Sequence, residues 1–183
     1  MTRQELLESL ADNHEAQIKK TLENLEEEII STISRATEGE LISTRVAIEL
    51  RKDIKRHIQE TYLFEADTII REYDKIVNEF LNEFGTLNIP DKFKSLTKID
   101  LETINALKYQ SFSGFEDLAN RYLTDISSNV YQNAIAGRSF RDMVKDIKGK
   151  VTGLEDRAGK PMSSHAGQLA HDSIMQFDGQ FTI

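Results

Sequence analysis

The first 35 residues contain neither glycine nor proline, and apolar side chains recur through them at steps of three and four. This spacing places the apolar side chains on one side of an α-helix. Thr2 and Glu5 have the spacing of a capping box, so the pattern predicts one helix from about residue 2 to residue 35, roughly 50 Å long. The predicted apolar stripe consists of Leu7, Ala11, His14, Ile18, Leu22, Leu25, Ile29 and Ile33.

A second apolar stripe follows a break at Thr37-Glu38-Gly39 and predicts another helix of about 40 residues. A kink is expected near Tyr62-Leu63-Phe64. Two long helices joined by a short turn most economically form an antiparallel hairpin, so residues 1–84 are predicted to be a projecting helical hairpin. Its second stripe consists of Ala47, Leu50, Ile54, Ile58, Tyr62, Ala66, Ile69, Tyr73, Ile76, Phe80 and Phe84.

The remainder of the chain is predicted to be a linker followed by shorter helices. Residues 85–99 contain Pro90 and are predicted to be a linker. Helix caps then recur at short intervals, which predicts a bundle of short helices over residues 100–183. The predicted boundaries are a helix from Asp100 to Leu107, one opened by Ser113 and ended by Gly137, one opened by Ser139 and ended by Gly149, and a last helix beginning near Ser164. The predicted fold class is therefore all-α, a long antiparallel hairpin followed by a short-helix bundle.

Composition excludes several classes of protein. The chain has no cysteine, which excludes disulfides, thiol catalysis and thiolate metal sites. No apolar run approaches the ~20 residues that span a bilayer, and the charged first ten residues do not form a signal-peptide core, so we expect a soluble chain that starts unprocessed. Phosphate-binding loops, nucleophile elbows and zincin motifs are absent. The four histidines are scattered, so we predict no catalytic residue, no cofactor and no metal site.

Charge is unevenly distributed along a chain of net charge −8. The acidic front of the chain makes general adhesion to nucleic acid improbable. The segment 137–150 is locally basic, and its bases recur at steps of three or four on one side of a short predicted helix. A weak nucleic-acid contact there is one interpretation, and an ordinary solvated charged face is the other. The four bases are Arg138, Arg141, Lys145 and Lys148.

The two stripes of the predicted hairpin are the candidates for protein contacts. We expect them to support self-association in several copies, or docking onto another protein. The bases between Arg45 and Arg56 are expected to pair with Glu26, Glu27 and Glu28 across the hairpin. The predicted interface residues are Ile18, Leu22, Leu25, Ile29, Leu50, Ile54 and Ile58.

Residues 130–183 resemble a known family. The strings VYQNAIAGRSFRDMVKDIKGKVTG and HAGQLAHDSIMQFDGQFT resemble the C-terminal half of the helical region of tailed-phage minor head proteins, the Mu F-like family. Gly137 and Ser139 match the family's G-x-S element, which precedes a short helix. Ala170-His171-Asp172-Ser173 occupies the place where many members have Ala-Arg-Thr-Glu, and departs from that pattern.

The resemblance implies a virion protein present in a few copies. Such a protein is recruited from the host cytoplasm with the portal protein and other head proteins, and stays in the phage head near the portal vertex, where it affects DNA packaging or ejection. Members usually continue into a region with Cys and His suggestive of zinc, so the reading frame is expected to continue past Ile183. A cellular coiled-coil adaptor or scaffold is the alternative. A membrane-active protein is disfavoured, because the stripes are narrow and the front is acidic.

Overall fold

The computed structural model describes residues 1–37, 43–86, 96–153 and 160–180. Of these residues 91 % are helical, and none lies in a strand. The all-α prediction is confirmed. The predicted linker falls largely on residues 87–95, which lie outside the described residues.

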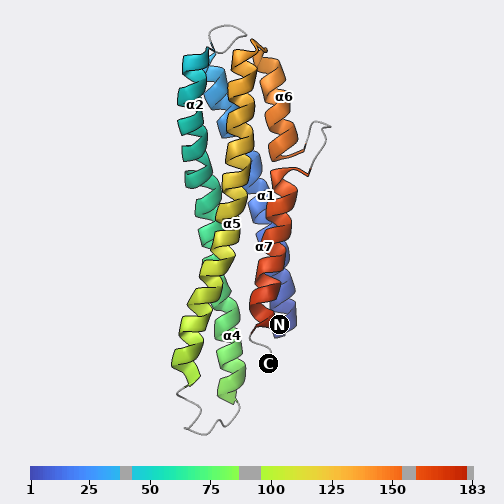
Figure 1. Cartoon of the computed structure of the whole chain (residues 1–183). Coiled ribbons are helices and arrows are strands. Elements are labelled where there is room, and N and C mark those ends of the chain that lie inside the picture. Colours follow the sequence, from blue (N-terminus) through green and yellow to red (C-terminus); the bar gives the residue numbers. More distant parts are fainter. Residues whose placement is uncertain (38–42, 87–95, 154–159, 181–183) are drawn as a thin grey trace.

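The described helices form four columns that run up, down, up and down along one elongated bundle (Figure 1). The first and third columns are single helices, whereas the second and fourth are each built from consecutive shorter ones. The start of α1 and the end of α7 lie toward the same end (Figure 1). In chain order the elements are α1 (Arg3–Ala36), α2 (Thr44–His57), η1 (Ile58–Leu63), α3 (Phe64–Arg71), α4 (Tyr73–Thr86), α5 (Leu96–Ile135), α6 (Phe140–Val151) and α7 (Met162–Gly179).

Helix α1 forms as its sequence predicts. The Thr2 hydroxyl accepts a hydrogen bond from the Glu5 backbone N–H at 3.2 Å, and the Glu5 carboxylate accepts one from the Thr2 N–H at 2.8 Å. This capping box satisfies two of the donors that a helix start leaves open. Every residue of the predicted stripe is buried, from Leu7 to Ile33.

The first two columns run antiparallel, but they do not project as a hairpin. Helix α1 packs most extensively against α7, the last helix, and one buried core extends from Leu7 to Phe177. The α1–α7 contact is close because α7 presents Gly167 there: a Cβ at that position would lie 2.7 Å from Cε of Lys19. The predicted units 1–84 and 100–183 therefore share one core, because a stripe fixes which side of a helix is buried and not which helix covers it.

The second column contains a π-helix, η1, at the place where the kink was expected. Its buried residues advance by four from Leu50 through Ile54 and Ile58 to Tyr62 and Ala66. In an α-helix, each step of four turns the stripe by about 40° away from the core. A π-helical turn holds more residues, so it returns the later residues to the core-facing side.

The third column corrects the predicted boundaries. Helix α5 is continuous through Ser113, where a new helix was predicted to begin. Phe115 is fully buried there and its ring packs against Tyr62, with ring centroids 6.3 Å apart, so tertiary packing outweighs the local capping signal. Gly137 follows the end of α5 with a φ of 66°, as its predicted role requires.

The fourth column begins where the sequence predicts, but its first helix, α6, ends later than predicted. The Ser139 hydroxyl accepts a hydrogen bond from the Asp142 N–H and caps α6. Helix α6 passes through Gly149 to Val151, and the left-handed residue that follows it is Gly153, with a φ of 78°. Helix α7 then begins at Met162, two residues before the predicted start.

Candidate interaction surfaces

The structure places the seven predicted interface residues inside the bundle. Each side chain is at most 2 % exposed, because the chain's own columns cover both stripes. These residues form the core of a single chain, and a second protein has no access to them in this fold. The residues concerned are Ile18, Leu22, Leu25, Ile29, Leu50, Ile54 and Ile58.

The four predicted nucleic-acid residues lie at one end of the bundle. Arg138 precedes α6, and Arg141, Lys145 and Lys148 lie on one side of that helix. Arg138 and Arg141 are exposed, whereas Lys145 and Lys148 are half-buried. None of the four forms an ion pair within the described part of the chain.

Lys148 differs from the other three because it faces a buried acid of α1. Glu26 is buried, and burial raises the pKa of its carboxyl. The Thr152 hydroxyl donates a hydrogen bond to Glu26 at 2.6 Å, and the positive charge of Lys148 opposes the rise in pKa. Lys148 therefore has a favourable charge interaction across the α6–α1 contact, whereas Arg138, Arg141 and the half-buried Lys145 are the bases left for an external anion.

The bases of α2 do not pair with the glutamates of α1 as predicted. Lys52 pairs with Glu49 and Arg56 with Asp53, both within α2. From the second column, Nδ1 of His57 lies 3.4 Å from the Glu28 carboxylate, and the Thr61 hydroxyl donates a hydrogen bond to that carboxylate. Pairs three residues apart on one helix bring the charges together more directly than a contact across two helices, which explains the correction.

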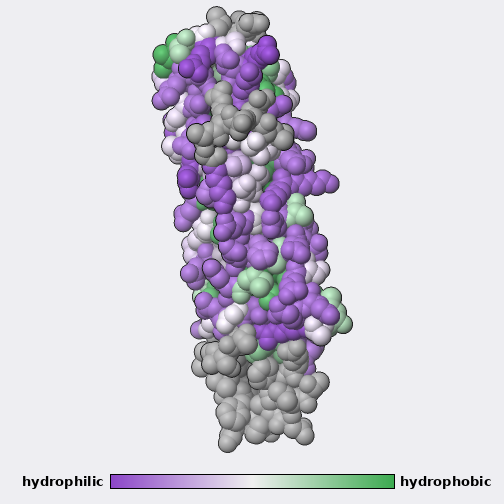
Figure 2. Space-filling view, turned by 90° about the vertical axis from the view of Figure 1, so that its right-hand side faces the viewer, coloured by the Kyte–Doolittle hydropathy of each residue, from purple (hydrophilic) through white to green (hydrophobic). Residues whose placement is uncertain are grey.

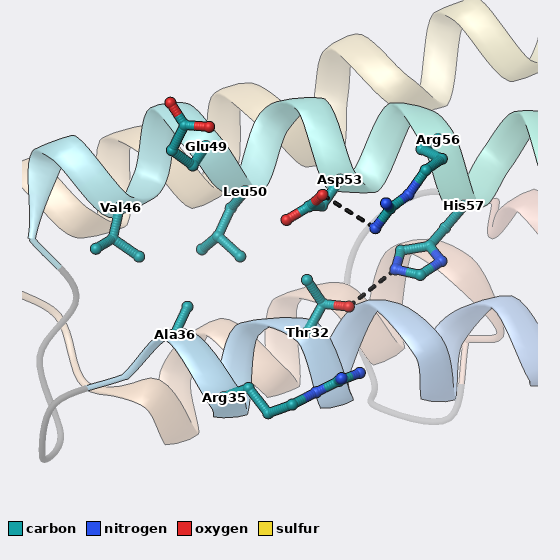
Figure 3. Close-up of a pocket in the computed structure, with 9 residues that line it drawn as sticks. All are labelled: Thr32, Arg35, Ala36, Val46, Glu49, Leu50, Asp53, Arg56 and His57. Atoms are coloured by element: carbon teal, nitrogen blue, oxygen red, sulfur yellow. Dashed lines mark hydrogen bonds and ion pairs between the residues drawn. The ribbon is translucent and has the colours of Figure 1, made fainter.

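A shallow hollow of about 430 Å³ lies between the end of α1 and the start of α2 (Figure 3). The Thr32 hydroxyl lies 2.9 Å from Nε2 of His57, and Arg56 is directed to Asp53. The charged groups of its wall include both signs and are partly paired, so it selects no single kind of ligand. We call it the α1–α2 hollow; it is lined by Thr32, Arg35, Ala36, Val46, Glu49, Leu50, Asp53, Arg56 and His57.

A smaller hollow of about 170 Å³ lies on the other side of α2, against α5. Ile48 and Tyr131 line it and are exposed, which is unusual in a bundle whose other large apolar side chains are mostly buried. The sequence could have indicated that Ile48 is exposed, because Ile48 follows Ala47 but lies outside the predicted apolar stripe. We call it the α2–α5 hollow; it is lined by Ala47, Ile48, Arg51, Ser127, Ser128 and Tyr131.

A buried polar cluster crosses the other half of the bundle. His14 is fully buried on α1, and its Nε2 lies 3.0 Å from the Glu72 carboxylate. Burial lowers the pKa of His14, and the hydrogen bond to Glu72 only partly opposes this. The His14 ring stacks on Tyr73, and Tyr73 in turn packs against Phe177 of α7. The cluster connects α1, α4 and α7 inside the bundle, and its Glu72 side chain remains partly exposed.

In the described part of the chain, no three His, Asp or Glu side chains come close enough to share a metal ion. No helix in the described part of the chain is both long and apolar enough to cross a membrane. The side that carries α6 and α7 is mainly hydrophilic, with small separate apolar areas (Figure 2).

No protein-family model, no curated protein and no solved structure matches the chain.

Proposed function

We propose that this chain is a structural protein of a tailed phage, a minor head protein that acts by helix contacts at the portal vertex. It catalyses no reaction and requires no cofactor in this role. Its partners are the portal protein and other head proteins, and it is present in several copies in the head near the portal vertex.

One observation carries the proposal. The family-like element around Gly137 and Ser139 has a physical role here, since Gly137 supplies the left-handed turn after α5 and Ser139 caps α6. Together they reverse the chain between the third and fourth columns (Figure 1). The element therefore precedes a short helix, as the resemblance implies, and its two residues are of the kinds that commonly end one helix and cap the next.

The bundle suits a role that depends on contact. A core shared by all four columns makes one elongated body, and most of the described charged side chains lie outside that core. Different ends of such a body are able to bind different neighbours in an assembly. The bases Arg138, Arg141 and Lys145 lie at one end, where they are candidates for touching packaged DNA weakly.

The test is to locate the protein in the phage that encodes it. A tagged chain is expressed during head assembly, and DNA-filled heads are purified by gradient centrifugation. We expect the protein in those heads, in fewer copies than the shell protein, and cross-linked to the portal protein. Recovery only in the host cytoplasm, bound to host proteins, would instead identify the cellular adaptor.

A further inference from the structure

Three large apolar side chains are exposed together on the face formed by α2 and α5. Ile48 is 51 % exposed, Tyr131 41 % and Ile135 59 %. Ile48 and Tyr131 line the α2–α5 hollow, and Ile135 lies one helical turn beyond Tyr131 on the outside of α5. In a chain that buries its stripe residues completely, an exposed apolar group of this kind marks a contact surface.

The hollow between these side chains has room for one side chain of a partner. Its 170 Å³ equals the volume of about five or six water molecules. Ser127 also lines it, but the Ser127 hydroxyl is buried, so it presents no accessible donor to a partner.

The charges beside the hollow have one sign. Arg51 lines it, and Lys55 lies one turn further along the same side of α2. Neither base forms an ion pair with any described residue. The acids of α2, Glu49 and Asp53, lie on the opposite side of the helix, where they line the α1–α2 hollow. The surface is therefore apolar in its centre and basic along one edge.

We propose that this surface, Ile48, Arg51, Lys55, Tyr131 and Ile135, docks an acidic amphipathic helix of another protein. An apolar side chain of that helix fills the α2–α5 hollow, and its carboxylates face Arg51 and Lys55. A second copy of this chain is the poorer occupant, because a symmetric contact would set the two basic edges against each other. The inference does not depend on the proposed phage function, since an adaptor would use the surface in the same way.

The experiment uses the full chain and two labelled helical peptides. Both peptides carry the same leucine stripe; one is flanked by glutamates and the other by lysines. In fluorescence anisotropy at low salt, we expect the acidic peptide to bind at least about tenfold more tightly than the basic one, and to weaken as salt is added. Binding of both peptides with equal affinity, or no binding of the acidic peptide at 1 mM (~4 kcal/mol), overturns the proposal.

Variants separate this surface from the rest of the molecule. Tyr131→Ser and Ile135→Ser should each weaken binding of the acidic peptide by roughly tenfold, because each removes exposed apolar area without changing the core. Arg51→Glu with Lys55→Glu should abolish the preference for the acidic peptide. The matched control, Arg141→Glu with Lys145→Glu on α6, makes the same charge change elsewhere and should leave binding unchanged.

Two other results count against the proposal. If the α6 control weakens the peptide as much as the α2 pair does, the attraction is a property of total charge and not of this surface. If the chain dimerises in light scattering and Tyr131→Ser abolishes the dimer, the occupant is a second copy. Circular dichroism of every variant ensures that folded proteins are compared.

Discussion

His14 is a buried ionisable residue whose protonation is changed by the fold. Its pKa is lowered by burial, so the folded chain holds it neutral at pH 7, with Nε2–H donating to Glu72. Nδ1 is then an acceptor, and it is buried without a partner in the described structure. Burial also raises the pKa of Glu72, but hydrogen bonds from His14 and Lys75 outweigh that effect and hold the pKa below its usual value.

We predict that His14 makes the fold less stable in mild acid. Below the unfolded pKa of 6.5, the unfolded chain binds a proton that the folded chain resists. The free energy of unfolding should therefore fall as the pH drops from about 6.5 toward the folded pKa of His14. Urea unfolding at pH 7 and pH 5.5 measures the fall, which should be smaller in His14→Leu. His171→Leu is the control, and it should behave as the parent does because His171 is partly exposed. An equal fall in all three proteins would contradict the prediction.

At the scale of a single element, the spacing of the buried residues in the second column explains why it contains the π-helix η1. Four successive steps of four, from Leu50 to Ala66, cannot stay on one side of a straight α-helix. The sequence therefore contained the reason for the expected kink, although periodicity alone does not say which residues form the wider turn.

We predict that deleting Gln59, an exposed residue of η1, leaves a folded bundle. The deletion removes the extra residue, so an ordinary α-helical turn connects α2 and α3 in register. Thermal melts followed by circular dichroism should remain cooperative, with a midpoint within several degrees of the parent (~1–2 kcal/mol). Deleting Asn120, which is exposed on the regular helix α5, is the comparison. That deletion should abolish the cooperative melt, because it turns one half of the helix by about 100°. If the two deletion variants have the same thermal melts, the prediction that η1 contains one extra residue is wrong.

Helix α6 supports a prediction about nucleic acid. With Lys148 directed to Glu26, three bases remain, so duplex DNA binding should be weak and lose affinity with salt at a log–log slope of roughly −3. Arg138→Gln with Arg141→Gln should reduce the slope to about −1, whereas Arg51→Gln with Lys55→Gln on α2 should leave it unchanged. Filter binding over a salt series gives the slopes, and binding that does not vary with salt would refute this role for α6.

For the whole molecule, the sequence predicts helices better than it predicts their neighbours. The α1 stripe, the Thr2 cap and the Gly137 turn are local patterns, and each is confirmed. Which column covers α1 is a long-range choice that periodicity does not encode. The same limit applies to the candidate site: Leu22 and Ile54 were predicted to support self-association or docking, but the structure buries both, and Ile48 was not predicted as a contact residue.

A single charge introduced into the core should therefore unfold the chain, and not only dissociate an assembly of several copies. Leu22→Asp places an unpaired carboxylate in the core, at a cost above about 4 kcal/mol. Circular dichroism should show loss of helix at any protein concentration. Asn24→Asp adds the same charge at an exposed position two residues away and should change stability by less than about 0.5 kcal/mol. A Leu22→Asp chain that stays helical but has a smaller mass in light scattering would return Leu22 to an interface between proteins.

The pairing of α1 with α7 also sets an order of events during synthesis. Helix α1 leaves the ribosome before α7, which is its most extensive partner. About 125 residues separate the two helices, which at roughly 5–20 residues per second means about 6–25 s of translation. For that time the stripe of α1 lacks its main cover. The nascent chain must therefore shield those leucines and isoleucines with the second column, or with a chaperone, until α7 arrives.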